Sequence, residues 1–311
     1  MQSAPHPDLL QGALPLTDWA LIRALGDDAR SFLQGQLTQD VLLWSEDQAR
    51  PAGYCSPKGR LLASFVLWQR SPQEVMLACS ADLLAPTLKR LSMYVLRAKC
   101  KLSDATAERP LVGLAGAAAV QALGEAAPAA PWQRRTVGDA DVLRLPDAAG
   151  TPRFLWSGPG APADLPALAP EAWAWLEVQS AVPRITAPTV EQFVPQMVNL
   201  EAVGGVNFKK GCYPGQEVVA RSQYRGTLKR RAFLFEVAGT PAPGQEIFAA
   251  AEPDQPAGMV VNVAAVPGAP GRWTLLAETK IALSDGALHL GAPDGPLLQA
   301  QPLPYALPTE V

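Results

Sequence analysis

The sequence predicts an α+β protein built from two similar α+β units and a small C-terminal antiparallel β-barrel or sandwich. Residues 1–108 carry apolar patterns in the order strand, helix, strands, helix, strand, which is close to a ferredoxin-like split βαβ arrangement. A similar order recurs over residues 109–230, which predicts a second ferredoxin-like unit. Residues 231–311 instead show short apolar runs separated by glycine and proline, without a helical pattern. We therefore expect three domains with these bounds.

The first unit should contain two helices and one sheet. Asp27 and Asp28 are good N-cap residues, and apolar residues then recur at helical spacing, so a helix is predicted over residues 29–41. The sequence SPKG at residues 56–59 has the composition of a type I turn and should join two strands. A second amphipathic helix is expected over residues 84–95. The other predicted strands are 19–25, 60–68, 74–80 and 100–105.

The second unit repeats this pattern with shorter elements. A hairpin is predicted over residues 136–145, turning at Gly138 and Asp139. Ala/Pro-rich stretches at 126–131 and 158–170 indicate loops. The remaining predicted elements are strands at 111–114 and 153–156, helices at 117–123 and 171–180, and an extended run that begins at Arg184.

Composition excludes several classes of protein. With 311 residues, 48% hydrophobic and 18% charged, the chain has a globular composition and can bury a large core. The net charge of −3 argues against a general polyanion binder, so any anion site must be local. The longest apolar runs are far shorter than a membrane helix needs, and the N-terminus lacks the pattern of a signal peptide, so we expect no membrane partner.

Cysteine and histidine usage limits the chemistry further. The four cysteines have no paired or zinc-like spacing, which is typical of reduced thiols in a cytoplasmic protein. The two histidines, His6 and His289, lie in no motif, so a histidine-based triad or metal site is not expected. We predict no resident metal, because scattered cysteines do not supply the grouped thiolates of an iron–sulfur cluster.

One segment, residues 204–231, concentrates candidate functional residues. Pro214 and Glu217 suit the start of a helix over residues 216–224, which should end near Gly226. Cys212 then lies just before this helix, with Lys209 and Lys210 beside it. Positive charge and a helix start both favour the thiolate, so we interpret Cys212 as a reactive thiol rather than an inert buried one.

The same segment is strongly basic. Between Lys209 and Arg231 there are seven basic residues and one acid, Glu217, in a chain that is acidic overall. This asymmetry predicts a surface for an anionic partner, such as a phosphate backbone, a polyglutamate tail or an acidic protein. The alternative is an ordinary solvated surface. No stacked-aromatic RNA module accompanies the stretch, so direct nucleic-acid binding stays open.

The run KKGCYPGQE at 209–217 resembles the KGCYxGQE signature of the YgfZ family, folate-binding proteins similar to the glycine-cleavage T-protein. FLQGQLTQDV at 32–41, the turn between Tyr54 and Arg60, and FVPQMVNL at 193–200 extend the resemblance. It implies two α+β units around a central channel for tetrahydrofolate, with a C-terminal barrel. The site residues that it implies are Cys212 as the reactive thiol and, for the cofactor, Lys210, Gly211, Tyr213, Gly215, Gln216, Glu217, Arg221 and Gln179.

The resemblance also implies a role in the assembly or repair of iron–sulfur enzymes, including those that thiolate tRNA, with iron–sulfur carriers or client enzymes as partners. An alternative function is aminomethyl-type one-carbon transfer with tetrahydrofolate. The sequence departs from the pattern of the resembled proteins at two places. Leu62 and Ala63 stand where the T-protein has catalytic acids, which disfavours aminomethyl transfer. Gln179 stands where the T-protein and several YgfZ-like proteins have a glutamate for the pterin, with Glu177 two residues earlier. A protein-interaction scaffold that makes no use of folate is the remaining alternative.

Overall fold

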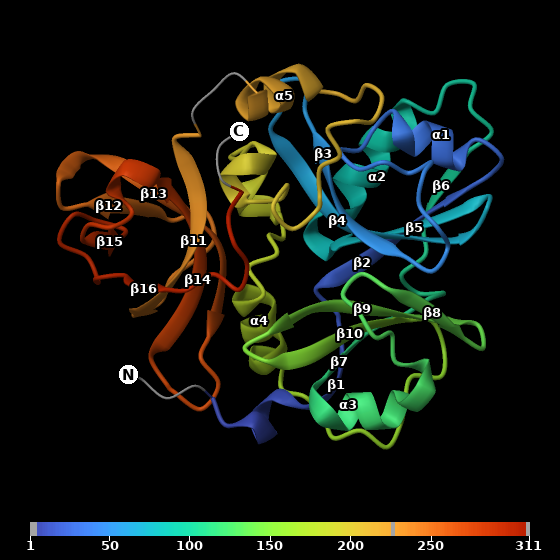
Figure 1. Cartoon of the computed structure of the whole chain (residues 1–311), viewed down its shortest axis with the longest axis horizontal. Helices are drawn as coiled ribbons and strands as arrows, with labels where there is room; N and C mark the ends of the chain where they lie inside the picture. The colour runs from blue at the N-terminus through green and yellow to red at the C-terminus, as the bar shows by residue number, and fades with distance from the viewer. Residues whose placement is uncertain (1–4, 225–227, 309–311) are drawn as a thin grey trace.

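The computed structural model describes residues 5–224 and 228–308 and shows a mixed α and β fold with three antiparallel sheets (Figure 1). Two of the sheets lie one above the other on the right of the view, and the C-terminal sheet lies on the left. Helix α4 (Pro170–Gln179) runs between the C-terminal sheet and the other two. In the described part of the chain, no helix is long and apolar enough to cross a membrane.

The first sheet has the order β3-β4-β5-β2-β6 and is accompanied by helices α1 and α2. Ser56–Gly59 forms the expected turn, in which Gly59 N donates to Ser56 O at 2.8 Å. The predicted strands 19–25 and 74–80 are present with these bounds. The elements are β2 (Trp19–Leu25), α1 (Ala29–Gln34), β3 (Ala49–Cys55), β4 (Leu61–Ser71), β5 (Glu74–Ser80), α2 (Leu84–Met93) and β6 (Lys101–Asp104).

The helix predicted over 29–41 is wrong in its second half, because α1 ends at Gln34. Gly35 follows, and the next residues bond to the edge of β3 instead of continuing the helix. Leu37 bridges to Tyr54, and Thr38 N donates to Gly53 O at 2.9 Å. Leu37 and Val41 are still fully buried, so the apolar spacing predicted burial correctly. The backbone of these residues is not helical, because it covers the edge of the sheet.

The second sheet has the order β1-β7-β10-β9-β8, with α3 packed on β10 and β7. Its hairpin turns at Gly138 as expected, with φ +59°. Strand β1 lies within residues 1–108 but pairs with β7, because an extended N-terminal segment reaches the edge of the second sheet. The elements are β1 (Gly12–Pro15), β7 (Leu111–Ala115), α3 (Gly116–Leu123), β8 (Arg134–Val137), β9 (Ala140–Ala148) and β10 (Thr151–Ser157).

The C-terminal sheet is a curled half-barrel with the order β15-β12-β13-β14-β11-β16 (Figure 1). The predicted antiparallel β-barrel is therefore present as a half-barrel: within the described residues, β15 and β16 form its two edges. Helix α4 packs against β13 and β14, and Trp175 Nε1 on α4 donates to Thr274 Oγ1 at 3.1 Å. The strands are β11 (Arg230–Ala238), β12 (Glu246–Ala249), β13 (Glu252–Ala265), β14 (Arg272–Lys280), β15 (Leu288–Leu290) and β16 (Gln299–Gln301).

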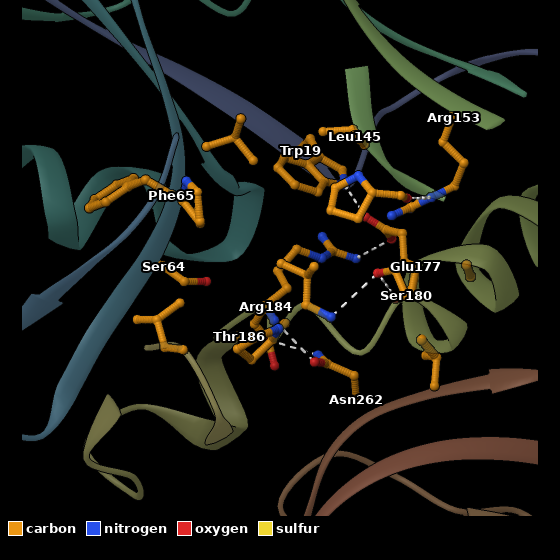
Figure 2. Close-up of a pocket in the computed structure, with 18 of the residues that line it drawn as sticks. Trp19, Ser64, Phe65, Leu145, Arg153, Glu177, Ser180, Arg184, Thr186 and Asn262 are labelled. Atoms are coloured by element: carbon orange, nitrogen blue, oxygen red, sulfur yellow. Dashed lines mark hydrogen bonds and ion pairs between the residues drawn. The ribbon is translucent and has the colours of Figure 1, made fainter. Parts of the chain in front are cut away.

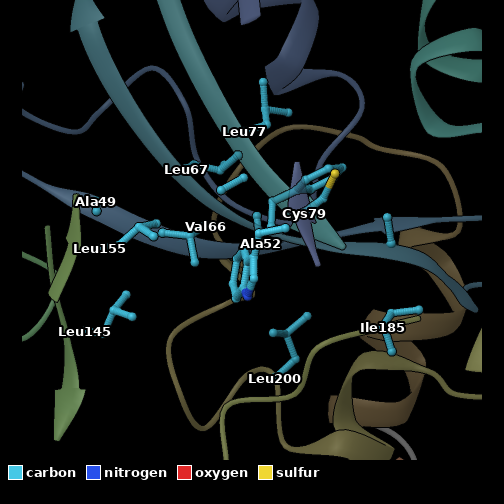
Figure 3. Packing of buried hydrophobic residues seen from close by; sticks show 14 of the residues in the cluster. Ala49, Ala52, Val66, Leu67, Leu77, Cys79, Leu145, Leu155, Ile185 and Leu200 are labelled. Atoms are coloured by element: carbon cyan, nitrogen blue, oxygen red, sulfur yellow. The ribbon is translucent and has the colours of Figure 1, made fainter. Parts of the chain in front are cut away.

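One continuous apolar core connects the three sheets. Figure 3 shows Leu145 and Leu155 of the second sheet near Val66 and Ala49 of the first. The same cluster includes Leu276 of the half-barrel. Because burial of apolar area is the main favourable term in folding, this shared core fixes the position of each sheet relative to the others.

A buried ion cluster also joins the first two sheets. Asp141 on β9 has no exposed surface and accepts a hydrogen bond from Trp68 Nε1 on β4 at 3.1 Å. The same carboxylate contacts the guanidinium groups of Arg70, Arg109 and Arg134 at 3.0, 3.0 and 2.5 Å. A buried charge is tolerated only when it is paired in this way, so Asp141 holds together residues from both sheets.

Candidate functional site

A cavity of about 130 Å³ lies where the first two sheets, α4 and the half-barrel meet (Figure 2). Its walls are largely apolar and aromatic, with Trp19 and Phe65 from the first sheet and Trp132 from the chain that precedes β8. Asn262 on β13 contributes from the half-barrel. Residues from every part of the fold therefore line one cavity, which is the usual setting of a ligand site.

Among the described residues that line this cavity, Glu177 on α4 is the only carboxylate. Its Oε1 accepts a hydrogen bond from Trp19 Nε1 at 3.0 Å, and its Oε2 accepts one from the Arg184 guanidinium at 3.3 Å. Burial raises the pKa of Glu177, while Arg184 opposes that rise. Arg184 is itself held by Asp18 at 2.6 Å. The arrangement fixes a carboxylate at the cavity wall.

The extended run that begins at Arg184 connects the half-barrel to the first sheet, as its predicted extended conformation allows. Arg184 N donates to Asn262 Oδ1 at 3.0 Å, and Asn262 Nδ2 donates to Arg184 O at 2.7 Å. The next amide, Ile185 N, donates to Ser64 Oγ at 2.9 Å. These bonds satisfy backbone groups that no sheet ladder serves, and they position the Arg184 side chain beside Glu177 (Figure 2).

Gln179, the residue predicted to contact the pterin, is not among the residues that line this cavity. Its side-chain amide lies 3.5 Å from Thr274 Oγ1, against the half-barrel. Residues two apart on a helix point about 200° away from each other. The side chain of Glu177 therefore faces the cavity, and that of Gln179 faces the half-barrel. The resemblance gave Gln179 the sequence position of the pterin-binding glutamate, whereas Glu177 is on the face of α4 that meets the cavity.

The motif around Cys212 forms a loop beside the first sheet, leading into helix α5 (Gln216–Tyr224), which has the predicted bounds. Its predicted end near Gly226 lies outside the described residues. Lys210 is buried, and its Nζ donates to the carbonyl oxygens of Gln34, the last residue of α1, and of Leu37, which follows the helix. Burial lowers the pKa of Lys210 to about 8, although Asp40 acts in the opposite direction. Lys210 thus anchors the loop.

Glycines allow this loop to pack closely on the turn between β3 and β4. A Cβ at Gly215 would lie 2.4 Å from Ser56 O and 2.6 Å from Gly59 Cα, and Gly215 has φ +77°. Gly59 has φ +73°, and a Cβ there would lie 2.8 Å from Val218 Cβ. Only glycine fits such a contact and such a conformation. The motif's glycine therefore packs the loop directly on the turn at residues 56–59.

The structure divides the predicted site residues into an anchored group and an exposed group, and none of them lines the cavity. Tyr213 is buried, with its ring centroid 4.9 Å from Lys210 Nζ, and Gln216 begins α5. The exposed members of the motif are Gly211, Cys212, Glu217 and Arg221. The loop and the cavity are therefore two separate places in the fold.

Several basic side chains between Lys209 and Arg231 are bonded within the protein. Lys210 contacts backbone carbonyls, Arg230 pairs with the buried Glu278, and Arg231 pairs with Glu201. Arg225 lies outside the described residues. The remaining basic side chains, Lys209, Arg221 and Lys229, are exposed and have no ion pair among the described residues. A surface for an anionic partner stays a prediction, and it rests on these three.

The four thiols differ sharply in their surroundings. Cys55 and Cys79 are buried, Cys100 is half-buried and Cys212 is exposed. Burial raises the pKa of Cys55 and of Cys79 to about 12, and that of Cys100 to about 11. No group of three or more His, Cys, Asp or Glu side chains placed to hold a metal ion occurs in the described part of the chain.

We expect alkylation of the native protein at pH 8 to modify Cys212 more than about tenfold faster than any other cysteine, because the thiolate is the reactive form and access is required. Iodoacetamide labelling followed by peptide mass spectrometry measures each rate. After denaturation all four should react at similar rates. Faster native labelling of Cys55 or Cys100 than of Cys212 would show that the motif thiol is not the reactive one.

Curated proteins similar to this chain carry the name tRNA-modifying protein YgfZ. The protein of Edwardsiella ictaluri (strain 93-146) is 37% identical over 258 residues, covering 74% of this chain and 74% of its own length. That of Escherichia coli O45:K1 (strain S88 / ExPEC) is 31% identical over 323 residues, covering 97% of each chain. No protein-family profile matches the chain.

Among solved structures, the glycine cleavage system aminomethyltransferase T from Bartonella henselae has a similar fold. The TM-score is 0.76 over 96% of this chain and 88% of that chain, at 16% sequence identity. The likeness establishes a shared fold that extends over all three sheets.

Proposed function

The chain belongs to the YgfZ family, and from that premise we propose that it is a folate-binding accessory protein for the assembly or repair of iron–sulfur enzymes, including those that thiolate tRNA. The name of the relatives, tRNA-modifying protein, supports the connection to tRNA. The observation that carries the proposal is the cavity at the junction of the three sheets, with one largely buried carboxylate in an aromatic wall. The fold shared with an aminomethyltransferase supports a folate-related role.

The residues of the cavity fit a tetrahydrofolate. Trp19, Phe65 and Trp132 offer flat apolar surfaces to a ring. Glu177 offers carboxylate oxygens to the amino-amide edge of a pterin, which has two adjacent N–H donors. The volume of about 130 Å³ suits a ring rather than a whole drug-sized ligand. In our proposal the pterin occupies the cavity, the two α+β units surround it as ferredoxin-like halves of a central channel, and the glutamate tail extends toward solvent.

This chain has no acid where aminomethyl transfer needs one. Strand β4 reads LLASFVLWQRS, with Leu62 half-buried and Ala63 buried at the positions of the T-protein acids. Glu177 is already bonded to Trp19 and Arg184. A carboxylate free to move a proton at the folate nitrogen is therefore missing from the cavity lining. We propose binding of folate, and not a complete transfer reaction, as the role of this cavity.

We assign contact with iron–sulfur carriers or client enzymes to the loop that bears Cys212. The loop is exposed and lies apart from the cavity, so a partner can reach the thiol while folate is bound. Lys209, Arg221 and Lys229 supply positive charge for an anionic partner surface. A partner-bound role that needs no folate would leave these features in place, so folate binding itself has to be tested.

Titration calorimetry with 5-formyltetrahydrofolate tests the proposal. The wild-type protein should bind it, and Glu177→Gln should bind about 10- to 100-fold more weakly, since hydrogen bonds to charged groups contribute about 1.5–3 kcal/mol. Glu171→Gln is the matched control, because Glu171 is exposed on the first turn of the same helix and does not line the cavity. A wild-type protein that binds no reduced folate would refute the folate role and favour the interaction scaffold.

A further inference from the structure

Arg153 on β10 is a buried cation whose role the fold alone does not explain. Its exposed fraction is 2%, and it lines the cavity (Figure 2). Its Nε donates to Pro146 O at 3.1 Å, and its guanidinium carbon lies 5.6 Å from the centroid of the Trp173 ring. These two contacts hold the guanidinium in place.

The two terminal nitrogens of Arg153 have no hydrogen-bond acceptor among the described residues. Glu177, the carboxylate of the same cavity, is bonded to Trp19 and Arg184 instead. Burial lowers the pKa of Arg153 to about 10, although Glu177 and Asp147 act in the opposite direction. Desolvation therefore outweighs the attraction of nearby carboxylates.

An unpaired buried charge lowers the stability of a fold, and an apolar side chain of similar size is often neutral or stabilising in its place. The protein nevertheless keeps a guanidinium here, with its free donors directed at the cavity. Groups that stabilise nothing in the folded chain are typical of ligand sites, where stability is given up for recognition. A ligand that brings an acceptor would supply the missing partner.

We propose that Arg153 donates a hydrogen bond to the ring carbonyl oxygen of the pterin. Glu177 accepts hydrogen bonds from the neighbouring amino and ring N–H groups. This assignment rests on the proposed folate-binding function. The edge of a pterin presents an amino group, a ring N–H and then the carbonyl oxygen, which is two donors followed by an acceptor. A carboxylate next to a guanidinium complements that order, because the first only accepts and the second only donates.

The location of Arg153 favours the ring over the glutamate tail of folate. Arg153 is almost fully buried, and the side chain of Glu177 is 15% exposed, so the polar groups lie deep in the cavity. Each carboxylate of a glutamate tail would need to give up its hydration to reach Arg153, whereas the ring enters an aromatic cavity readily. Both residues therefore contact one edge of the same ring system.

Two ligands and one substitution distinguish contact of Arg153 with the pterin ring from contact with the glutamate tail. The ligands are 5-formyltetrahydrofolate and 6-methyltetrahydropterin, which has the ring but no tail. Arg153→Met removes the donors and keeps the length of the side chain. Its affinity for both ligands should fall by the same factor of about 10 to 100, as expected for a lost hydrogen bond to a charged group. The matched control is Arg144→Met, because Arg144 also lies over an aromatic ring, that of Phe154, but does not line the cavity.

The ligand-free Arg153→Met protein should melt at or above the wild-type temperature, which a structural role would not permit. Equal affinity of Arg153→Met and wild type for both ligands would overturn the assignment and leave the folate-binding function intact. A loss confined to the ligand with a tail would overturn it in favour of a tail contact. A wild-type protein that binds neither ligand would instead refute the proposed function. Arg153→Lys, which keeps the charge without the planar fork, should lose part of the affinity for both ligands.

Discussion

Replacing Asp141 with asparagine should lower the free energy of unfolding by about 3–5 kcal/mol, the usual effect of removing one partner from a buried ion pair. Asp141 is fully buried and contacts three guanidinium groups, those of Arg70, Arg109 and Arg134. Asparagine keeps the shape but loses the charge, and its amide hydrogens would face other donors. Arg70 and Arg109 retain the exposed Asp139, whereas Arg134 keeps only uncharged acceptors, Glu46 O and Thr136 Oγ1.

The matched control is Asp147→Asn on the same strand. Asp147 pairs with Arg144 at 2.6 Å but its side chain is 46% exposed, so the change should cost no more than about 1 kcal/mol. Urea denaturation followed by far-ultraviolet circular dichroism measures both variants. A change of less than about 1 kcal/mol for Asp141→Asn would mean that the cluster does not hold the two sheets together as argued.

Local patterns were sufficient for most of the fold. Strand β2 and helix α5 have the predicted bounds because alternation, caps and helical spacing are all local signals. The end of α1 was missed because Leu37 and Thr38 bond to β3, a contact across many residues of sequence. Strand β1 was missed because its four residues gain order from the edge of β7 and from residues 166–168, both distant in sequence. Each error follows from a partner that is distant in sequence.

The candidate site divides in the same way. The motif could be predicted because its residues are contiguous, and the exposed position of Cys212 agrees with a reactive thiol. The cavity could not, since Trp19, Arg153 and Glu177 converge on it from three separate segments. One signal was present: Arg153 lies in TPRFLWS, an otherwise largely apolar strand, where a charged residue among buried neighbours marks a position that needs a partner.

We expect Cys212→Ser to abolish support of tRNA-thiolating iron–sulfur enzymes in cells that lack the native protein, as the proposed function requires. Cys212 is exposed, so serine should change the free energy of unfolding by no more than about 0.5 kcal/mol. Serine retains the size of the side chain but not the thiolate that serves as nucleophile or metal ligand.

The measurement is the amount of thiolated nucleoside in tRNA, determined by mass spectrometry after complementation with each variant at matched protein level. Cys100→Ser is the control, because Cys100 is half-buried and burial raises the pKa of its thiol to about 11, so that little thiolate is present near neutral pH. This control should restore thiolation to the wild-type amount, whereas Cys212→Ser should leave it at the level of the deletion strain. Full restoration by Cys212→Ser would show that the exposed thiol is dispensable. Contact with an anionic partner through Lys209, Arg221 and Lys229 would then be the remaining role of the loop.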